Sequence, residues 1–302
     1  MAGQKNTRDE TSDSSGSATA IAEWTVAEAA RCIRVPATTD DKYRHGVLGV
    51  VTGSSAYPGA AVLGVDAAHA AGVGMVRFLG DPGVAERVME RRPETVLVDG
   101  RVQAWLVGSG TEWTLPEAAS EVVTRALASG EPAVCDAGAL PLAENATGIT
   151  VVTPHHAECA RLLNITREQV DADPVGSASV LADRFRTTVV LKGHVTLIVS
   201  PPQAGERFAH CVTAGTTWLA TAGTGDVLAG IIGALLATHA AELPSDARGA
   251  SSFRAAELAA TAVLIHGLAA LRAGSGGPFG ASDIAPHLGA VIAGIVENHG
   301  DA

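Results

Sequence analysis

The sequence predicts an α/β protein, with a mostly parallel central sheet and helices on both of its faces. Short runs rich in β-branched residues alternate with alanine-rich stretches of helical length along most of the chain. Hydrophobic residues make up 47% of the 302 residues and charged residues 18%, which is enough for a large core and excludes wholesale disorder. Aromatic residues are only 4% while glycine occurs 34 times, so we expect an aliphatic, alanine-packed core with several tight backbone sites.

The elements can be assigned in order along the chain. Residues 1–20 are rich in Ser, Thr and Asp, so we expect a disordered tail followed by a single domain over 21–302. Apolar spacing after Trp24 predicts a short helix that ends before Pro36. Expected strands lie at 47–51, 75–79, 96–98, 104–107, 133–135, 150–152, 188–191 and 196–199. Expected helices lie at 60–71, 117–128, 227–238, 255–271 and 284–296.

Charge and cysteine content exclude several classes of function. Lys plus Arg is 21 against 32 for Asp plus Glu, and the net charge of −11 argues against nucleic-acid and anionic-membrane partners. The four cysteines are scattered without C-x-x-C spacing, which argues against structural zinc and disulfides and fits a reducing compartment. The longest apolar segment, at 227–240, is interrupted by glycines and short for a bilayer. We therefore expect a soluble, cytoplasmic protein.

The most informative segment is ATAGTGDVLAGII at 220–232, where Gly223, Thr224 and Gly225 precede a strongly apolar helix. The first turn of a helix has unpaired N–H groups and a positive dipole end, which together bind anions. Asp226 is the one strong base in this turn, and it could take a proton from a hydroxyl that attacks a phosphate. A helix start with Asp as a cap or dipole partner fits the pattern equally well.

Other loops carry weaker signals. The sequence has neither a G-x-x-x-x-G-K-[ST] loop nor a G-x-G-x-x-G fingerprint, which weakens P-loop and dehydrogenase hypotheses. Lys192 could meet a phosphate, although an exposed hairpin lysine is the more common case. The adjacent His155 and His156 favour ligand contact or helix capping over metal binding, and we expect no metal site built from protein ligands. Asp136, at the end of an expected strand, could touch a ligand or cap a turn.

Taken in order, seven segments resemble one family, the NAD(P)H-hydrate dehydratases. These are ADP- or ATP-dependent nicotinamide nucleotide repair enzymes of the ribokinase-like superfamily. The resemblance runs from about Tyr43 to Arg272. The segments are GVLGVVTGSSAYPGAAVLGVDAAHAAGVGMVRF, RRPETVLV, WLVGSG, VCDAGAL, VVTPHHAECARLL, VVLKGHVT and WLATAGTGDVLAGIIGALLA.

The resemblance implies a three-layer α/β/α ribokinase-like domain that repairs hydrated NADH or NADPH. ADP or ATP would phosphorylate the ring hydroxyl with the help of Mg²⁺, and loss of phosphate would restore the dihydronicotinamide. Asp226 would be the base that activates the hydroxyl. The residues implied to bind the nucleotide are Lys192, Gly193, His194, Val195, Thr196, Gly223, Thr224 and Gly225. Those implied to contact the hydrate are Ala60, Gly110, His155 and Asp226.

The chain departs from the family pattern at three places. The usual K-G-A-G-T is Lys192-Gly-His-Val-Thr196, with His194 and Val195 replacing small residues. The usual G-P-G-L-G is Gly108-Ser-Gly-Thr-Glu112, with Ser109 and Glu112 as the changes. The usual G-N-P-G-L is Gly215-Thr-Thr-Trp-Leu219, changed at 216–218.

Two other functions stay open at this point. One is a kinase of the same superfamily that acts on a vitamin precursor or sugar, and the other is a non-catalytic nucleotide-binding protein. The 57–60 and 153–155 loops favour the dehydratase, and an intact Asp226 argues against a non-catalytic role. Many bacterial relatives also carry an N-terminal epimerase domain. The segments quoted above resemble the dehydratase domain only, so the resemblance implies that a separate chain supplies the epimerase. It also implies a homo-oligomer, with a tetramer as the expected form.

Overall fold

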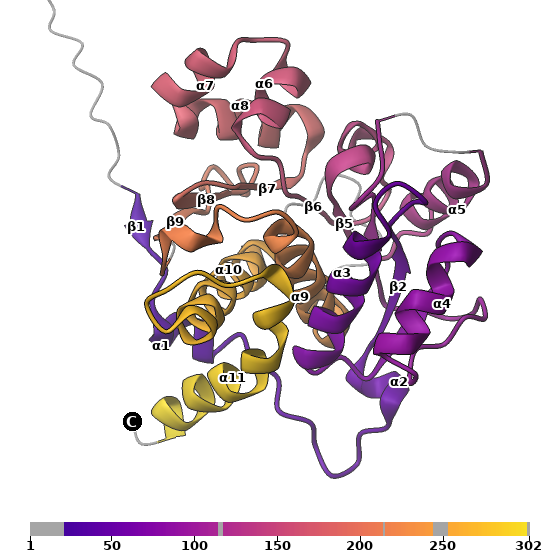
Figure 1. The fold of residues 1–302 in the computed structure, drawn as a ribbon. Coiled ribbons are helices and arrows are strands. Elements are labelled where there is room, and N and C mark those ends of the chain that lie inside the picture. Colours follow the sequence, from indigo (N-terminus) through magenta and orange to yellow (C-terminus); the bar gives the residue numbers. More distant parts are fainter. Residues whose placement is uncertain (1–20, 114–116, 214, 244–252, 301–302) are drawn as a thin grey trace, which may run out of the picture.

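A computed structural model describes residues 21–113, 117–213, 215–243 and 253–300. Within these ranges, helices cover both faces of one sheet, so the chain has the expected three layers (Figure 1). The predicted fold class, with a mostly parallel central sheet, is thereby confirmed. The tail expected at 1–20 lies outside the described residues.

The sheet places the carboxyl ends of its central strands at one edge. Its strands follow the order β1-β9-β8-β7-β6-β5-β4-β2-β3 in the described part of the chain. All neighbouring pairs are parallel except those of β8, which is antiparallel to both β7 and β9. The strands are β1 (Ala22–Glu23), β2 (Val47–Val51), β3 (Met75–Phe78), β4 (Ala104–Val107), β5 (Ala133–Cys135), β6 (Thr150–Val152), β7 (Thr188–Leu191), β8 (Val195–Val199) and β9 (Ala209–Thr213). The loops after β2, β4, β5, β6 and β7 therefore meet, and parallel sheets bind ligands at such an edge.

Two aliphatic cores hold the helices on the sheet. Along β2, Leu48 and Val50 face one core, while Val47 and Val51 face the other, as the two-residue period of a strand requires. The first core joins the sheet to α1 (Val26–Ala30), α3 (Pro58–Ala70), α4 (Pro82–Arg91), α9 (Thr224–Thr238), α10 (Phe253–Gly274) and α11 (Ala285–Gly300). The second core joins it to α5 (Glu117–Leu127), α6 (His156–Leu163), α7 (Arg167–Ala172), α8 (Pro174–Phe185) and the 3-10 helix Ala137–Asn145. The short helix α2 (Lys42–His45) precedes β2.

Helices α3 and α9 pack closely because glycines face each other across their contact. A Cβ on Gly230 would collide with the backbone oxygen of Gly64, and one on Gly64 would lie 3.5 Å from the backbone oxygen of Asp226. A larger side chain at either position would push the helices apart. This contact fixes the start of α9 relative to α3.

The structure corrects and extends the expected elements. The strand expected at 96–98 is wrong: Val96 forms a single bridge with Arg77, while Leu97 and Val98 are 45% and 69% exposed. An apolar tripeptide in an exposed loop has the composition of a strand, but this one pairs with a neighbouring strand at a single residue and so forms no ladder. The edge strand β1 and its neighbour β9 were not predicted, and neither were α4 and α6 to α8.

One helix in the described part of the chain, α10, is long and apolar enough to cross a membrane. In the structure, 72% of its most apolar window is buried against other elements, as in the core helix of a globular fold.

Candidate active site

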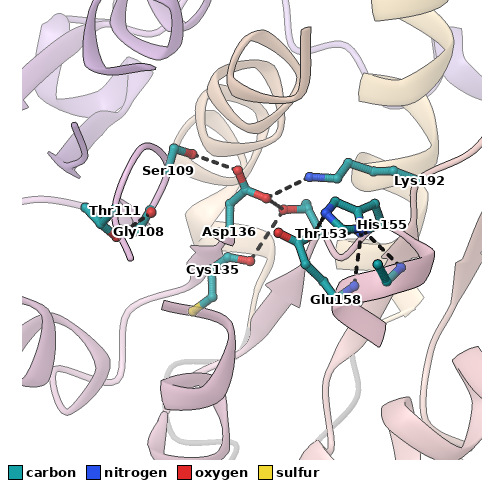
Figure 2. Close-up of polar contacts among 10 residues, drawn as sticks. Gly108, Ser109, Thr111, Cys135, Asp136, Thr153, His155, Glu158 and Lys192 are labelled. Carbon is teal, nitrogen blue, oxygen red and sulfur yellow. Dashed lines mark hydrogen bonds and ion pairs between the residues drawn. The ribbon is translucent and has the colours of Figure 1, made fainter. Parts of the chain in front are cut away.

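A buried carboxylate, Asp136, lies at the carboxyl end of β5 and joins the loops that follow neighbouring strands. Its Oδ1 accepts hydrogen bonds from Thr153 Oγ1 at 2.7 Å and Lys192 Nζ at 2.9 Å. Its Oδ2 accepts one from Ser109 Oγ at 3.0 Å. Figure 2 shows these donors arranged around the carboxylate. Burial acts to raise the pKa of Asp136, but Lys192 and the hydroxyl donors outweigh it, and the pKa is lowered.

Lys192, at the end of β7, extends from this carboxylate toward the start of α9. The backbone of Lys192 bridges to His155, which places the loop after β6 beside it. A Cβ on Gly225 would lie 3.4 Å from Lys192 Nζ, so the ammonium group lies against the first turn of α9. Burial acts to lower the pKa of Lys192, but Asp136, Glu158 and Asp226 raise it, so the side chain stays charged.

Helix α9 begins with a backbone arrangement suited to anions. Its N-cap is Gly223, with φ +91°, and no side chain caps the helix. Only glycine adopts this conformation readily, and a Cβ there would also lie 2.6 Å from Leu63 Cδ1. Thr224 Oγ1 bonds to the carbonyl oxygens of Leu219 and Thr221, so its hydroxyl holds the preceding turn. The N–H of Thr224 donates to the carbonyl oxygen of Thr221, while those of Gly225 and Asp226 have no acceptor in the described part of the chain and can bind an anion.

Asp226, in the first turn of α9, has the properties of a general base. The first cause of its raised pKa is burial, the second is the negative charge of Asp136, and Lys192 opposes both. The net effect raises the pKa to about 7. No ion pair or side-chain hydrogen bond joins its carboxylate to a residue in the described ranges. A base acts best when its pKa lies near the working pH, and Asp226 meets this condition.

A cavity of about 700 Å³ lies beside these groups. Its walls come from the β7–β8 hairpin, the start of α9, the segment before it, and α10. The predicted site residues among its lining residues are His155, Lys192, Gly193, His194, Thr196, Thr224 and Gly225. Val195, Gly223 and Asp226 are not among them. Val195 is 45% exposed, Gly223 lies against α3, and a carboxylate oxygen of Asp226 lies 3.9 Å from the position of a Cβ on Gly223. A cavity of this size fits a nucleotide.

Two of the residues predicted to contact the hydrate form a second group, outside that cavity. Gly110 follows β4 with φ +67°, and a Cβ on it would collide with Ala60 at the start of α3. The same Cβ would lie 3.0 Å from the backbone oxygen of Tyr57. Because α3 also packs on the first turn of α9, this group and the cavity lie on different sides of the α9 start.

His155 lies with the Lys192 loop rather than with Ala60 and Gly110. It is the N-cap of α6, and its Nδ1 accepts hydrogen bonds from the backbone N–H groups of Ala157 and Glu158. Capping was one of the two roles that the sequence left open for this residue. Its side chain also lines the cavity, so contact with a ligand there stays a prediction.

The role of one buried site residue, and the presence of another, were not predicted. Asp136 was expected to touch a ligand or cap a turn, but its side chain makes no capping hydrogen bond and instead pairs with groups from three other loops. His266, on α10, lines the cavity and is only 7% exposed, and its Nε2 has no hydrogen-bond partner in the described part of the molecule. A histidine inside an alanine-rich, apolar stretch was the available signal for it. Of the departures from the family pattern, Ser109 has a clear function, since it donates to Asp136.

Metal ligands are sparse. No cluster of three or more His, Cys, Asp or Glu side chains in the described residues is arranged to hold a metal ion. The negative charge of Asp136 acts on Asp226 and helps to raise its pKa. A Mg²⁺ ion commonly takes one or two carboxylates together with substrate phosphates and water, so this donor set fits Mg²⁺ carried by a nucleotide.

Comparisons with known proteins agree on one family. A family model described as NAD(P)H-hydrate dehydratase matches residues 48–276. An ADP-dependent (S)-NAD(P)H-hydrate dehydratase of Neisseria meningitidis serogroup B is 35% identical over 221 residues, which cover 67% of this chain and 73% of the relative. A bifunctional NAD(P)H-hydrate repair enzyme of Mycobacterium leprae is 42% identical over 257 residues, which cover 81% of this chain. The matched regions span 38%, 49% and 43% of the length of three such bifunctional relatives.

Solved structures show the same fold. The crystal structure of an ADP/ATP-dependent NAD(P)H-hydrate dehydratase from Bacillus subtilis, co-crystallized with ATP/Mg²⁺, superposes with a TM-score of 0.78 at 22% identity. The superposition covers 92% of this chain and 100% of that one. A ribokinase-like superfamily protein from Enterococcus faecalis gives 0.73 at 23% identity over 91% and 96% of the two chains. The fold is therefore ribokinase-like, and the match of the family model over most of the chain shows that it belongs to the NAD(P)H-hydrate dehydratase family.

Proposed function

We propose that the protein uses a nucleoside phosphate to dehydrate hydrated NADH or NADPH and so return the dihydronicotinamide. One observation carries the proposal: Asp226, a carboxylate with a pKa of about 7 and no ion pair in the described ranges, lies in the first turn of a helix whose N–H groups can hold phosphate. The adjoining cavity of about 700 Å³ has room for the nucleotide. Membership of the dehydratase family supports the same substrate class.

The proposed reaction has two steps. Asp226 takes the proton of the ring hydroxyl, whose oxygen attacks the terminal phosphorus of the nucleotide and displaces the shorter nucleotide. The C–O bond of the phosphorylated hydrate then breaks, phosphate leaves with the bonding electrons, and a neighbouring ring carbon loses a proton to form the double bond. The helix N–H groups and Lys192 stabilise the negative charge on the transferred phosphoryl group. Phosphorylation thus replaces a poor leaving group, hydroxide, by a good one.

We propose ADP as the phosphoryl donor, with ATP as the alternative. The relative from Neisseria meningitidis is named as ADP-dependent, and the Bacillus subtilis protein as ADP/ATP-dependent. Mg²⁺ would reach the site with the phosphates, which together with water would supply most of its ligands. When bound, the ion would offset charge on the phosphoryl oxygens.

The decisive experiment incubates the purified protein with hydrated NADH, Mg²⁺ and either ADP or ATP. Recovery of the dihydronicotinamide absorbance is the expected result, and no recovery with either nucleotide would refute the proposal. Asp66→Asn is a suitable control, because Asp66 is also buried but is paired with Arg91 and Arg92 outside the site. A stable phosphorylated product from another alcohol would instead favour the kinase of a vitamin precursor or sugar.

Assembly, location and partners stay predictions. We propose a homo-oligomer, tetrameric by family resemblance, in the cytoplasm, with a separate chain supplying epimerisation of the hydrate. Sedimentation velocity of the purified protein tests the oligomeric state. Addition of a mixture of hydrate epimers tests the need for a separate epimerase, since this chain alone would then convert only one epimer.

A further inference from the structure

A second cavity, of about 560 Å³, lies at the end of β3, and the proposed reaction does not yet use it. The loop after β3, helices α4 and α5 and the segment before β4 form its walls (Figure 1). Phe78, Leu79, Met89, Leu97 and Val122 make much of this lining apolar. Small-molecule sites are typically concave and mostly apolar with a few polar groups, and a cavity of this size has room for a nucleoside.

This cavity lies on the same side of the molecule as the hydrate group formed by Ala60 and Gly110. Its wall residue Gly80 packs on the end of the neighbouring strand β2, because a Cβ there would lie 2.9 Å from the backbone oxygen of Thr52. The next residue along the chain, Gly53, lies against the hydrate group, since a Cβ on Gly110 would lie 3.3 Å from Gly53 Cα. The start of the loop after β2 therefore touches both the second cavity and the hydrate group.

The proposed substrate has a second half that still needs a place. Hydrated NADH is a dinucleotide, and contact with Ala60 and Gly110 accounts for its nicotinamide half alone. The cavity of about 700 Å³ is assigned to the phosphoryl donor and lies on the other side of the α9 start. The adenosine half of the hydrate would therefore extend away from that cavity, along the edge of the sheet where the loops after β2 and β3 lie.

The charged side chains of the second cavity suit a ribose that carries no extra phosphate. Asp99 Oδ2 pairs with Arg125 Nη2 at 2.9 Å, so the one cation among the described lining residues is already neutralised. Glu86, on α4, makes no ion pair or side-chain hydrogen bond with any residue in the described ranges. Its carboxylate can accept hydrogen bonds from ribose hydroxyls, as acidic residues do in dinucleotide sites. The two carboxylates would repel a phosphate on the same ribose.

We propose that the second cavity takes the adenosine half of the hydrate, and that Glu86 binds its ribose hydroxyls and so favours hydrated NADH over hydrated NADPH. The inference rests on the proposed function, because it places the other half of the same substrate. It assigns to Glu86 a role in specificity, since this carboxylate meets a hydroxyl in one dinucleotide and a 2′-phosphate in the other.

Binding of NADH and NADPH, the products of the proposed repair, tests the assignment without turnover. Fluorescence of the dihydronicotinamide gives the Kd of each with the purified protein, and we expect NADH to bind at least about ten times more tightly. Glu86→Gln should weaken NADH binding about tenfold, because a hydrogen bond to a charged group is lost. Glu86→Arg should reverse the preference. Glu90→Gln is the matched control, since Glu90 is exposed one turn further along α4 and does not line the cavity.

Reduced nicotinamide mononucleotide shows which half of the dinucleotide Glu86 contacts. It lacks the adenosine half, so its Kd should be the same for the unaltered protein, Glu86→Gln and Glu86→Arg. Equal weakening of the mononucleotide and NADH, or an unchanged Kd for NADH in Glu86→Gln, would overturn the inference. Either result in a protein that repairs the hydrate would leave the proposed function intact. Binding of NADH that depends on Glu86, in a protein that repairs no hydrate, would refute the proposed function alone.

Discussion

The carboxylate of Asp226 is the side chain on which the proposed chemistry depends most directly. Asp226→Asn preserves the shape of the side chain but removes its ability to accept a proton at neutral pH. Because a positioned general base contributes about 10²- to 10⁴-fold, we expect kcat to fall by that factor. Steady-state kinetics measures the loss, and calorimetric titration with ADP should give an affinity close to that of the unaltered protein. A parallel loss of ADP affinity would mean that Asp226 binds the nucleotide rather than activating the hydroxyl.

His266 makes stability depend on pH. Burial lowers its pKa from 6.5 to about 4, so below about pH 6.5 the unfolded chain binds a proton that the folded chain does not. The contribution is therefore complete above the pKa of the unfolded state and is lost as the pH falls to about 4. The upper bound on this loss is about 3 kcal/mol. Asp226, whose pKa is raised to about 7, contributes in the opposite direction over the same range, so the loss is measured as the difference between the unaltered chain and His266→Leu in urea unfolding between about pH 7 and pH 4.

Between about pH 7 and pH 4, His266→Leu should lose less stability than the unaltered chain. Burial also lowers the pKa of His69 and His239, so these two histidines retain part of the slope. An unchanged slope in His266→Leu would contradict the assignment. The stability of His266→Leu at neutral pH can also change, because the substitution alters packing in α10, so only the pH dependence tests the assignment.

Individual site residues could be predicted from sequence only where one segment carries the whole signal. Gly223, Gly225 and Asp226 lie in a single helix start, so local rules identified an anion site and its base. The role of Asp136 depends on Ser109, Thr153 and Lys192, which follow three different strands. Only the order and register of the sheet bring these residues together, and no local pattern contains that information.

At the scale of elements, a glycine at the contact between α3 and α9 and an exposed glycine in α11 predict opposite effects of substitution by alanine. Gly230→Ala places a Cβ against the backbone oxygen of Gly64, which cannot move without shifting α3. Overpacking of this kind costs about 1–3 kcal/mol. Gly289, in α11, has open space around a Cβ, and Gly289→Ala should stabilise by about 0.5–1 kcal/mol through helix propensity. Chemical denaturation measures the free energy of unfolding of both variants. An unchanged value for Gly230→Ala would show that α3 and α9 have room to separate.

The same elements show why some parts of the fold were easier to predict than others. The strands expected at 47–51, 104–107, 133–135, 150–152 and 188–191 match β2, β4, β5, β6 and β7, because buried parallel strands are continuous runs of β-branched residues. The two-residue strand β1 has no such signal, since it exists only by pairing with β9, which is distant in sequence at 209–213. The amphipathic helices α6 to α8 are short and begin at the caps His155, Thr166 and Asp173, which composition alone does not reveal.

At the scale of the whole molecule, the candidate nucleotide cavity joins parts of the chain that are far apart in sequence. The loop after β6, the β7–β8 hairpin, the start of α9 and the middle of α10 all contribute to its walls. These elements belong to both faces of the sheet, since α6 packs on one core and α9 and α10 on the other. A nucleotide bound there would contact elements of both layers, so its binding free energy should add to the stability of the whole domain.

Nucleotide binding should therefore raise the free energy of unfolding of the entire protein in a single transition. At a free ADP concentration about 100 times its Kd, the gain is about 2.7 kcal/mol. Urea unfolding with ADP and Mg²⁺ measures it, and Asp226→Asn should show the same gain because the base is not required for binding. Adenosine at the same concentration should give a much smaller gain, since it offers no phosphate to the N–H groups of α9 or to Lys192. An equal gain with adenosine would place the binding energy in the nucleoside and contradict an anion site at Gly223–Asp226.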